Sequence, residues 1–332
     1  MADPNDALLG FWKGRRVLVT GHAGFVGSNL VAELLDRGAL PVGYDRVLSS
    51  PSLRVLGVNC PSVLGDVLDL AALRHIVADL RPEVVFHLAG SAHIADSHAA
   101  PHQAFSVNVM GTVTTLDAVR LEAPSAIVVV ASSNEVYPAG GPWREDHRPE
   151  PRTLYGWSKL CQDEVARAYG QVLGLKIACL RHANAIGPAN PHRTHLVSSV
   201  IEALLCNEYL RLRSDGSPRK AYLAVQDVCA AYLRIAEALA EGKIHSGRAW
   251  NAGSNETPSA LDVAKALIAL SIRSITIECA ASTPDGPDQA RYWQGLDSRA
   301  LATLGWEPRP FKEALTETWR WYVNHGTIGR GW

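Results

Sequence analysis

The chain has 332 residues, of which 47% are hydrophobic, and a formal net charge of −1 at pH 7. This length and composition predict a large core and two lobes, and the near-neutral charge indicates neither a nucleic-acid nor a membrane partner. The six cysteines show no CxxC pairing and no metal-ligand spacing. We therefore expect no metal site and reduced thiols, as in a cytoplasmic protein. We expect no signal peptide and no membrane span.

The first predicted strand leads into a glycine-rich turn. Residues 15–20 are a short apolar run of the buried parallel-strand type. Residues 21–27 read Gly-His-Ala-Gly-Phe-Val-Gly, and a helical pattern follows as far as Gly38. A GxxGxxG between a strand and a helix is the context of a dinucleotide-binding turn, because its glycines let the backbone approach a pyrophosphate.

Acidic residues follow the next two predicted strands. The apolar run 40–44 ends in Asp45, whose carboxylate would accept hydrogen bonds from the adenosine ribose and repel a 2′-phosphate. Arg46 follows and is able to hold such a phosphate, but with the turn upstream we favour NAD over NADP. Asp66 precedes another helical pattern, where it either meets the adenine or caps that helix.

Three more strands complete an alternating pattern. Residues 82–90 form an apolar run ending in small residues, which leave room for a ligand over the sheet. Residues 101–122 are predicted as one long helix, and residues 127–131 and 176–180 as the fifth and sixth strands. Strands that alternate with helices indicate the α/β class, with a Rossmann-type, doubly wound parallel sheet.

The pattern changes beyond residue 187. Helices are expected at about 195–207, 226–241, 259–270 and 310–325, and short strands near 210–212, 221–224 and 274–278. This indicates a smaller mixed α/β lobe that closes over the substrate. We divide the chain into a dinucleotide-binding domain, 1–185, and a substrate-binding lobe, 186–332, and allow for the chain to cross back to the first lobe.

Tyr155 and Lys159 are the candidate catalytic pair. Residues four apart share one face of a helix. There the ammonium can lower the pKa of the phenol, so that Tyr155 exchanges protons near neutral pH. Such a pair alone is usually a solvated helix face. Here, however, the polar sequence Ser-Ser-Asn-Glu, residues 132–135, ends a hydrophobic run shortly before it.

Together these segments resemble the extended short-chain dehydrogenase/reductase family, which includes NAD-dependent nucleotide-sugar epimerases and dehydratases. The matching pieces, in the family's order, are Thr-Gly-His-Ala-Gly-Phe-Val-Gly at 20–27, His-Leu-Ala-Gly at 87–90, Asn-Val-Met-Gly-Thr at 108–112, Ser-Ser at 132–133, and Tyr155 with Lys159. The similarity runs from about residue 11 to 308. Within the family, segments 11–27, 84–110 and 296–308 look most like CDP-glucose 4,6-dehydratases.

The resemblance implies a role for each matching residue. Tyr155 would be the base toward a sugar hydroxyl, Lys159 would hold the nicotinamide ribose, and Ser133 would bind the reacting oxygen. The implied catalytic residues are Ser133, Asn134, Glu135, Tyr155 and Lys159. The implied NAD-binding residues are Gly21, Ala23, Gly24, Phe25, Val26, Gly27, Asp45, Arg46, Asp66, Val67, Leu88, Ala89, Gly90, Asn108, Tyr155 and Lys159. The implied substrate-binding residues are His93, Ser133, Asn184, Arg219 and Arg291.

Two departures from the family pattern bear on the chemistry. Asn134 occupies the acid-donor position of the dehydratases, where an amide cannot give up a proton as a carboxylic acid does; Glu135 occupies the position of the base. A second arginine for the substrate diphosphate is usual near a segment resembling 283–286, which is acidic here, and Arg291 is close without aligning cleanly. The expected substrate is a nucleotide sugar, with a nucleoside or nucleoside monophosphate as the alternative.

Four functions follow from the resemblance. We favour a 4,6-dehydratase, which oxidises the sugar, eliminates water and returns the hydride. A 4-epimerase needs only Tyr155 and Ser133, and a keto-sugar reductase or a non-enzymatic dinucleotide-binding homologue are the further alternatives. The family also implies a homodimer formed through the helices around 101–122 and 156–172.

Overall fold

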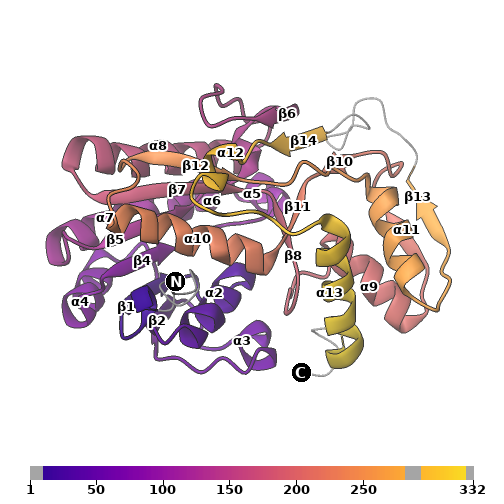
Figure 1. The fold of residues 1–332 in the computed structure, drawn as a ribbon, viewed down its shortest axis with the longest axis horizontal. Coiled ribbons are helices and arrows are strands. Elements are labelled where there is room, and N and C mark those ends of the chain that lie inside the picture. Colours follow the sequence, from indigo (N-terminus) through magenta and orange to yellow (C-terminus); the bar gives the residue numbers. More distant parts are fainter. Residues whose placement is uncertain (1–9, 281–292, 327–332) are drawn as a thin grey trace, which may run out of the picture.

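The computed structural model describes residues 10–280 and 293–326, and its centre is a seven-stranded parallel sheet (Figure 1). The strand order is β12-β7-β5-β4-β1-β2-β3. The strands are β1 (Arg16–Thr20), β2 (Leu40–Asp45), β3 (Ser62–Leu64), β4 (Val84–His87), β5 (Ile127–Ala131), β7 (Lys176–His182) and β12 (Arg248–Ala252). The order reverses between β1 and β4, so a crevice opens there at the carboxyl ends of the strands. The predicted doubly wound α/β class is confirmed.

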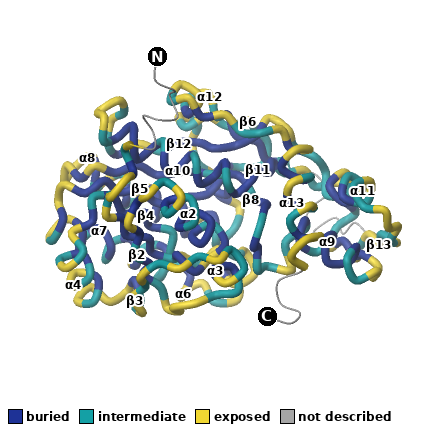
Figure 2. Tube along the Cα trace, turned by 60° about the horizontal axis from the view of Figure 1, so that its bottom comes forward, coloured by how far each residue is buried: buried dark blue, intermediate teal, exposed yellow. Residues whose placement is uncertain are grey.

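Helices cover both faces of this sheet, because its strands are apolar on both sides. Val17 and Val19 face a core shared with α2 (Phe25–Asp36) and α10 (Val225–Ala240). Leu18 faces the opposite core, shared with α4 (Leu70–Leu80), α7 (Gly111–Glu122) and α8 (Leu154–Leu173). Strands β1, β4, β5 and β7 therefore lie in the dark blue, buried centre of Figure 2, whereas β3 at the edge of the sheet is largely exposed. Two-sided burial explains why the sequence shows continuous apolar runs there.

The chain crosses back to the first lobe after residue 185. Helix α10 packs against α2, and β12 pairs with β7 at the edge of the main sheet. A division of the chain at residue 185 therefore does not coincide with the two lobes. The sequence analysis predicted α10 as a helix but did not predict β12, whose sequence Arg-Ala-Trp-Asn-Ala is neither alternating nor continuously apolar.

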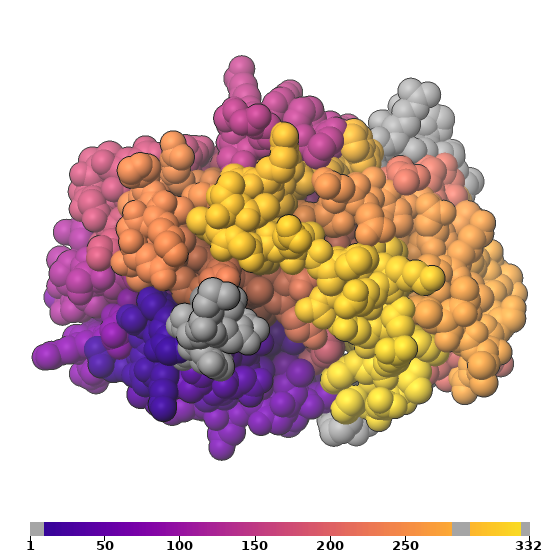
Figure 3. Space-filling view, in the orientation of Figure 1, coloured from indigo at the N-terminus to yellow at the C-terminus, as the bar shows by residue number. Residues whose placement is uncertain are grey.

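The second lobe is built around a separate core. Its helices are α9 (Leu196–Cys206), α11 (Ala260–Leu270) and α13 (Phe311–His325). Its strands pair in parallel as β8 (Asn184–Ile186) with β11 (Tyr222–Ala224), and β9 (Leu210–Leu212) with β13 (Ile277–Cys279). In Figure 3 the C-terminal part of the chain, in yellow, spans from the first lobe to this one. Helix α12 (Arg299–Ala302) packs on β12, and α13 packs on α9 and α11.

Shorter elements close the molecule over the carboxyl ends of the main strands. A three-stranded sheet joins β10 (Arg219–Lys220), β14 (Trp293–Leu296) and β6 (Gly140–Trp143). The remaining helices are α3 (Pro51–Val55), α5 (Ile94–Ala99) and a 3-10 turn, Asn134–Val136. The predicted helix 101–122 consists of α6 (Pro101–Phe105), a π-helical turn (Ser106–Met110) and α7. Such wide turns within helices are frequent at functional sites.

Candidate active site

The glycine-rich turn places bare backbone at the start of α2. Gly21 follows β1 with a φ of +73°, and a Cβ there would lie 2.6 Å from the backbone nitrogen of Ala89. A Cβ at Gly27 would lie 2.1 Å from the carbonyl oxygen of Gly21. Only glycine fits either position. The resulting N-terminus of α2 is shaped for a pyrophosphate, because its free N–H groups favour an anion.

Asp45 is fixed beside this turn. Its Oδ2 accepts a hydrogen bond from the backbone nitrogen of Ala23 at 3.1 Å, while Arg46 is exposed. The buried ring of His22 lies 3.9 Å from the same carboxylate. Burial lowers the pKa of His22, which outweighs the opposite effect of Asp45. The His22 ring beside Asp45 is therefore uncharged at neutral pH.

Asp66 does not cap the following helix. Its Oδ1 accepts a hydrogen bond from the backbone of Leu68 at 3.0 Å, within its own turn. The cap of α4 is Asp69, which accepts from Ala72. The helix-cap interpretation of Asp66 is thus wrong, and the proposal that it meets an adenine stands. Val67 is buried against Gly111, at the start of α7.

The end of β4 meets the π-helical turn at Asn108. Residues 88–90 follow the strand, and a Cβ at Gly90 would lie 2.8 Å from Asn108 Oδ1 and 3.3 Å from Lys159 Nζ. The Asn108 side chain bonds the backbone of Ser91 in both directions, at 2.8 and 3.1 Å. It also donates to Ser158 Oγ on α8 at 2.8 Å. Asn108 thus ties the end of β4 to the helix that carries Lys159.

A buried chain of hydrogen bonds that the sequence did not reveal fixes the same region. Thr112 Oγ1 donates to the Asn108 carbonyl at 2.7 Å and therefore accepts from His87 Nε2 at 3.0 Å. Consequently His87 Nδ1 accepts from Thr20 Oγ1 at 2.8 Å, and Thr20 accepts from the Ala89 backbone. Burial lowers the pKa of His87 to about 3, so the ring is neutral, as this directed chain requires.

Lys159 is buried on α8, and its ammonium donates two hydrogen bonds within the protein. The helix begins after Thr153, whose side chain accepts from the backbone of Gly156. Lys159 Nζ donates to the Ala131 carbonyl at 3.0 Å and to Gln162 Oε1 at 2.8 Å. Burial lowers the pKa of Lys159 to about 8. The ammonium therefore lies at the end of β5, beside the predicted NAD site.

Tyr155 has Ser133 as a neighbour, as the resemblance implies, but its acidity differs from our expectation. Burial raises the pKa of Tyr155 to about 12; the neighbouring Ser133 hydroxyl lowers it and the charge of Glu135 raises it. We expected Lys159 to lower this pKa, yet burial dominates, since Lys159 directs its ammonium to Ala131.

The turn that follows β5 brings three predicted catalytic residues together. Glu135 donates its backbone N–H to Ser133 Oγ at 3.1 Å. Asn134 Nδ2 donates to Gln294 Oε1, and Gln294 Nε2 donates to the Asn134 carbonyl, each at 2.8 Å. Gln294 is on β14 and completely buried. This double hydrogen bond fixes the turn, and it already employs the amide of Asn134.

Glu135 lies inside the site rather than on its surface. Only 6% of the residue is exposed. Its Oε1 lies 3.7 Å from Lys220 Nζ on β10, which is within ion-pair distance. The close approach of α8 depends on Gly156, where a Cβ would lie 2.4 Å from the carbonyl oxygen of Glu135.

The predicted substrate residues are held less firmly. Asn184 Nδ2 donates to the Ala221 carbonyl at 3.4 Å. Arg219 is 52% exposed, and its nearest charged partner, Asp262, is 3.9 Å away. Arg291 and the acidic segment 283–286 lie outside the described residues. His93 packs against two histidines that the sequence analysis did not single out, His192 and His195.

A buried ion pair anchors α8 to the sheet. Arg181 on β7 donates from Nε and from a terminal nitrogen to the two carboxylate oxygens of Asp163, at 2.9 and 3.0 Å. Its other terminal nitrogen donates to Tyr137 Oη at 2.7 Å, and Tyr137 donates to Asn251. Arg181 and Asp163 are both buried. The helix that carries Tyr155 and Lys159 is therefore attached to β7 by an ion pair as well as by packing.

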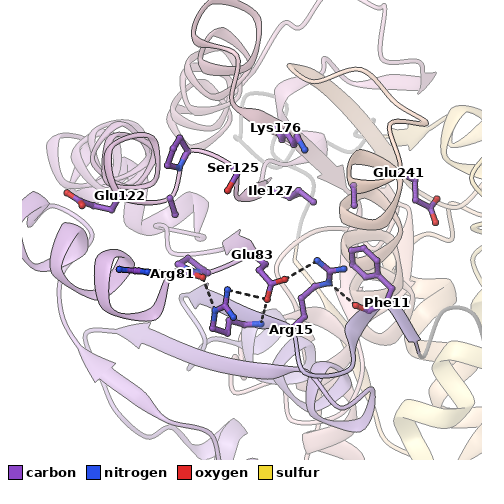
Figure 4. Close-up of a pocket in the computed structure, with 14 residues that line it drawn as sticks. Phe11, Arg15, Arg81, Glu83, Glu122, Ser125, Ile127, Lys176 and Glu241 are labelled. Carbon is purple, nitrogen blue, oxygen red and sulfur yellow. Dashed lines mark hydrogen bonds and ion pairs between the residues drawn. The ribbon is translucent and has the colours of Figure 1, made fainter.

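The described chain also has a hollow of about 580 Å³ at the opposite edge of the sheet. Figure 4 shows Arg15, Arg81 and Glu83 there, with Glu83 bonded to Arg15. These residues, like Lys176 at the start of β7, are at the amino ends of the strands. The hollow is thus remote from the candidate site.

Two negative findings hold for residues 10–280 and 293–326. In that part of the chain no set of three or more His, Cys, Asp or Glu side chains is arranged to hold a metal ion. None of its helices has the length and apolar character needed to cross a membrane.

Comparison with known proteins gives consistent results. Residues 17–253 match the NAD dependent epimerase/dehydratase family. The chain is 30% identical to the CDP-glucose 4,6-dehydratase of Salmonella typhimurium, over 93% of this chain and 89% of that protein. It is equally 30% identical to the UDP-glucose 4-epimerase of Mycolicibacterium smegmatis, over 93% and 99%. The structure of dTDP-glucose 4,6-dehydratase from Bacillus anthracis in complex with NAD superposes with a TM-score of 0.80 at 25% identity, over 94% and 98%.

Proposed function

Because the chain belongs to the NAD dependent epimerase/dehydratase family, we propose that it is a nucleotide-sugar dehydratase of the 4,6 type. The relatives carry the names of CDP-glucose and dTDP-glucose 4,6-dehydratases and of UDP-glucose 4-epimerases. These names support a hexose linked to a nucleoside diphosphate as the class of substrate. They divide between two reactions, so the choice rests on the residues of the site.

The residues around the crevice fit an NAD molecule. The glycines at 21 and 27 leave space that a Cβ would fill, Asp45 is fixed beside them, and Lys159 lies at the end of β5. When bound, NAD supplies the hydride acceptor and donor of the reaction.

Tyr155 and Ser133 would bind the sugar hydroxyl that is oxidised. The Ser133 hydroxyl is close enough to Tyr155 to lower the pKa of its phenol, so both side chains would meet the same hydroxyl. In its ionised form, the Tyr155 oxygen would accept the proton of a hydroxyl placed there, and Ser133 would hold that hydroxyl. Ser133 is itself fixed, since it accepts the backbone N–H of Glu135.

Glu135 is the observation that carries the dehydratase proposal. Its carboxylate is buried in the turn that holds Ser133, and Tyr155 experiences its charge. Once the neighbouring carbon is a carbonyl, a carboxylate here would take the adjacent C–H proton. The electron pair of that C–H bond forms the new C=C bond, the C–O bond to the leaving hydroxyl breaks, and a proton joins that oxygen to give water. An epimerase has no step that requires such a base.

The second candidate, a 4-epimerase, is favoured by Asn134. At the acid-donor position stands an amide whose Nδ2 is already bonded to Gln294. It cannot give up a proton as a carboxylic acid does, and one of its two N–H donors is already used. In the dehydratase, Glu135 itself would return the proton to the departing oxygen.

The test is Glu135→Gln together with the mass of the wild-type product. With CDP-glucose, dTDP-glucose and UDP-glucose as candidate substrates, the wild type should give a product that lacks one water. Glu135→Gln should abolish this loss and abolish solvent deuterium incorporation at the carbon beside the ketone. A product with the mass of its substrate, or wild-type turnover by Glu135→Gln, would replace the dehydratase with the epimerase.

A further inference from the structure

Three histidines meet at the junction of the lobes, near the catalytic turn. His93 precedes α5, and His192 and His195 lie in the loop that leads into α9. The ring centroids are 4.4 Å apart for His93 and His192, 4.9 Å for His192 and His195, and 5.5 Å for His93 and His195. We call these three residues the histidine cluster.

The rings leave hydrogen-bonding groups available. In the described part of the chain, neither the His93 ring nor the His192 ring forms a hydrogen bond. His195 Nδ1 lies 3.2 Å from Asn190 Nδ2, which can only donate. The neutral His195 ring therefore carries its own proton on Nε2, as a donor without a described protein acceptor.

Charged groups from three elements face the cluster. Arg213, after β9, donates to the Thr194 carbonyl at 3.3 Å and repels a positive charge on His195. Lys220 of β10 also repels a positive charge on His195. Its Nζ lies 3.7 Å from Glu135, which connects the cluster to the catalytic turn. Asp96 of α5 attracts a positive charge on His192. The surroundings of His195 are thus cationic.

These surroundings keep the rings uncharged. Burial lowers the pKa of His195 to about 3, helped by repulsion from the other two histidines and from both cations. Burial, and then repulsion from His93, lowers the pKa of His192 to about 4. A negative charge within about 4–6 Å raises the pKa of a histidine by roughly 1–3, and a diphosphate brings two such charges. A diphosphate bound against the rings would therefore raise their pKa values toward the neutral range.

Resting on the proposed function, we propose that the histidine cluster binds the esterified diphosphate of the substrate and takes up a proton as it does so. The cluster would take over part of the role that arginines have toward the substrate diphosphate in the family, since Arg219 is exposed and 3.9 Å from Asp262. Binding raises the affinity of the rings for a proton, so by linkage the affinity for substrate rises as pH falls.

The test is calorimetric titration of the NAD-loaded protein with UDP-glucose, dTDP-glucose and CDP-glucose. Each diphosphate is esterified at both ends and keeps its charge between about pH 6 and pH 8, so a pH dependence reports on the protein. Affinity should rise as pH falls, by at most about tenfold per pH unit for one proton. The binding enthalpy should also depend on the ionisation enthalpy of the buffer, which measures proton uptake directly.

Two variants locate the proton. His195→Asn and His192→Gln should each weaken binding and reduce the proton uptake, whereas His75→Asn, at a ring that is 82% exposed and pairs only with Asp79, should change neither. If no nucleotide sugar binds at any pH, the proposed function itself fails. If one binds without proton uptake, or if both variants retain the full uptake, the cluster is not the diphosphate site and this inference alone is overturned.

Discussion

The cofactor side and the substrate side of the site differ in how their polar groups are held. On the cofactor side, Asp45 accepts from Ala23, Asn108 bonds the backbone of Ser91, and Lys159 donates to Ala131. On the substrate side, Arg219 is half exposed at 3.9 Å from its nearest acid. On the first side these side chains already have partners within the protein, whereas the second side has groups that a ligand would satisfy.

This difference has a physical consequence for how each side responds to substitution. A buried polar group that loses its partner costs free energy of folding, because water cannot replace that partner. An exposed group that loses a distant partner is resolvated at little cost. We therefore expect changes on the cofactor side and beneath α8 to affect folding or turnover, and changes on the substrate side to affect substrate affinity.

The largest effect is expected from Tyr155→Phe. Removal of the phenolic oxygen should reduce turnover by about 10²–10⁴-fold, the range for a lost general acid–base group. The affinity for NAD should stay nearly constant, because Lys159 and Asn108 keep their own hydrogen bonds. Steady-state kinetics and a cofactor titration measure both quantities. Tyr169→Phe, on the same helix but beside Asp117, is the matched control. An equal fall in NAD affinity and turnover would show that Tyr155 is structural.

The next effect concerns the stability of the helix that carries the catalytic pair. Asp163→Ala leaves Arg181 buried with an unpaired charge, which typically costs about 3–5 kcal/mol of folding free energy. The adjacent Glu164→Ala breaks an exposed pair with Arg167 at 2.7 Å and should cost less than about 1 kcal/mol. Chemical denaturation of both variants measures the difference. Equal stabilities would mean that the ion pair does not anchor α8.

A smaller effect is expected where the second half of the chain reaches the catalytic turn. Gln294→Leu removes both hydrogen bonds to Asn134 and releases the turn that positions Ser133 and Glu135. A displacement of about 1 Å is sufficient to reduce turnover by roughly 10²-fold. Trp293 lies on the same strand as Gln294. Trp293→Phe removes one hydrogen bond, to Thr257, and should change turnover little. Steady-state kinetics and a cofactor titration of Gln294→Leu measure turnover and NAD affinity. A loss of turnover at unchanged NAD affinity indicates a displaced turn, whereas a loss of both would refute a positioning role.

The two sides also differ in how much of them could be predicted from the sequence. The glycine turn, Asp45 and the pair Tyr155 and Lys159 form short local patterns, because a strand, a turn and a helix follow one another. These patterns predicted the sheet and the position of the NAD site.

Residues contributed by distant segments could not be predicted in this way. Gln294 is 160 positions from Asn134, and nothing in its neighbourhood of the sequence distinguishes it. His192 and His195 acquire significance only through their distance from His93. The pKa of Tyr155 depends on how tightly the turn after β5 packs against α8. The helical pattern of residues 101–122 likewise gives no sign of the π-helical turn.

The smallest effect is expected from Arg219→Ala. This variant tests the difference between the cofactor side and the substrate side most directly. The guanidinium is exposed and its only described ion pair, with Asp262, is long, so the folding free energy should change by less than about 1 kcal/mol. If the resemblance is right, a substrate diphosphate recruits Arg219, and its removal should raise KM severalfold while turnover is retained. Arg211→Ala, on the neighbouring strand β9 and also exposed, should leave KM unchanged. A KM that does not change in Arg219→Ala would place the recognition of the diphosphate entirely on other groups, with the histidine cluster as the set that we propose.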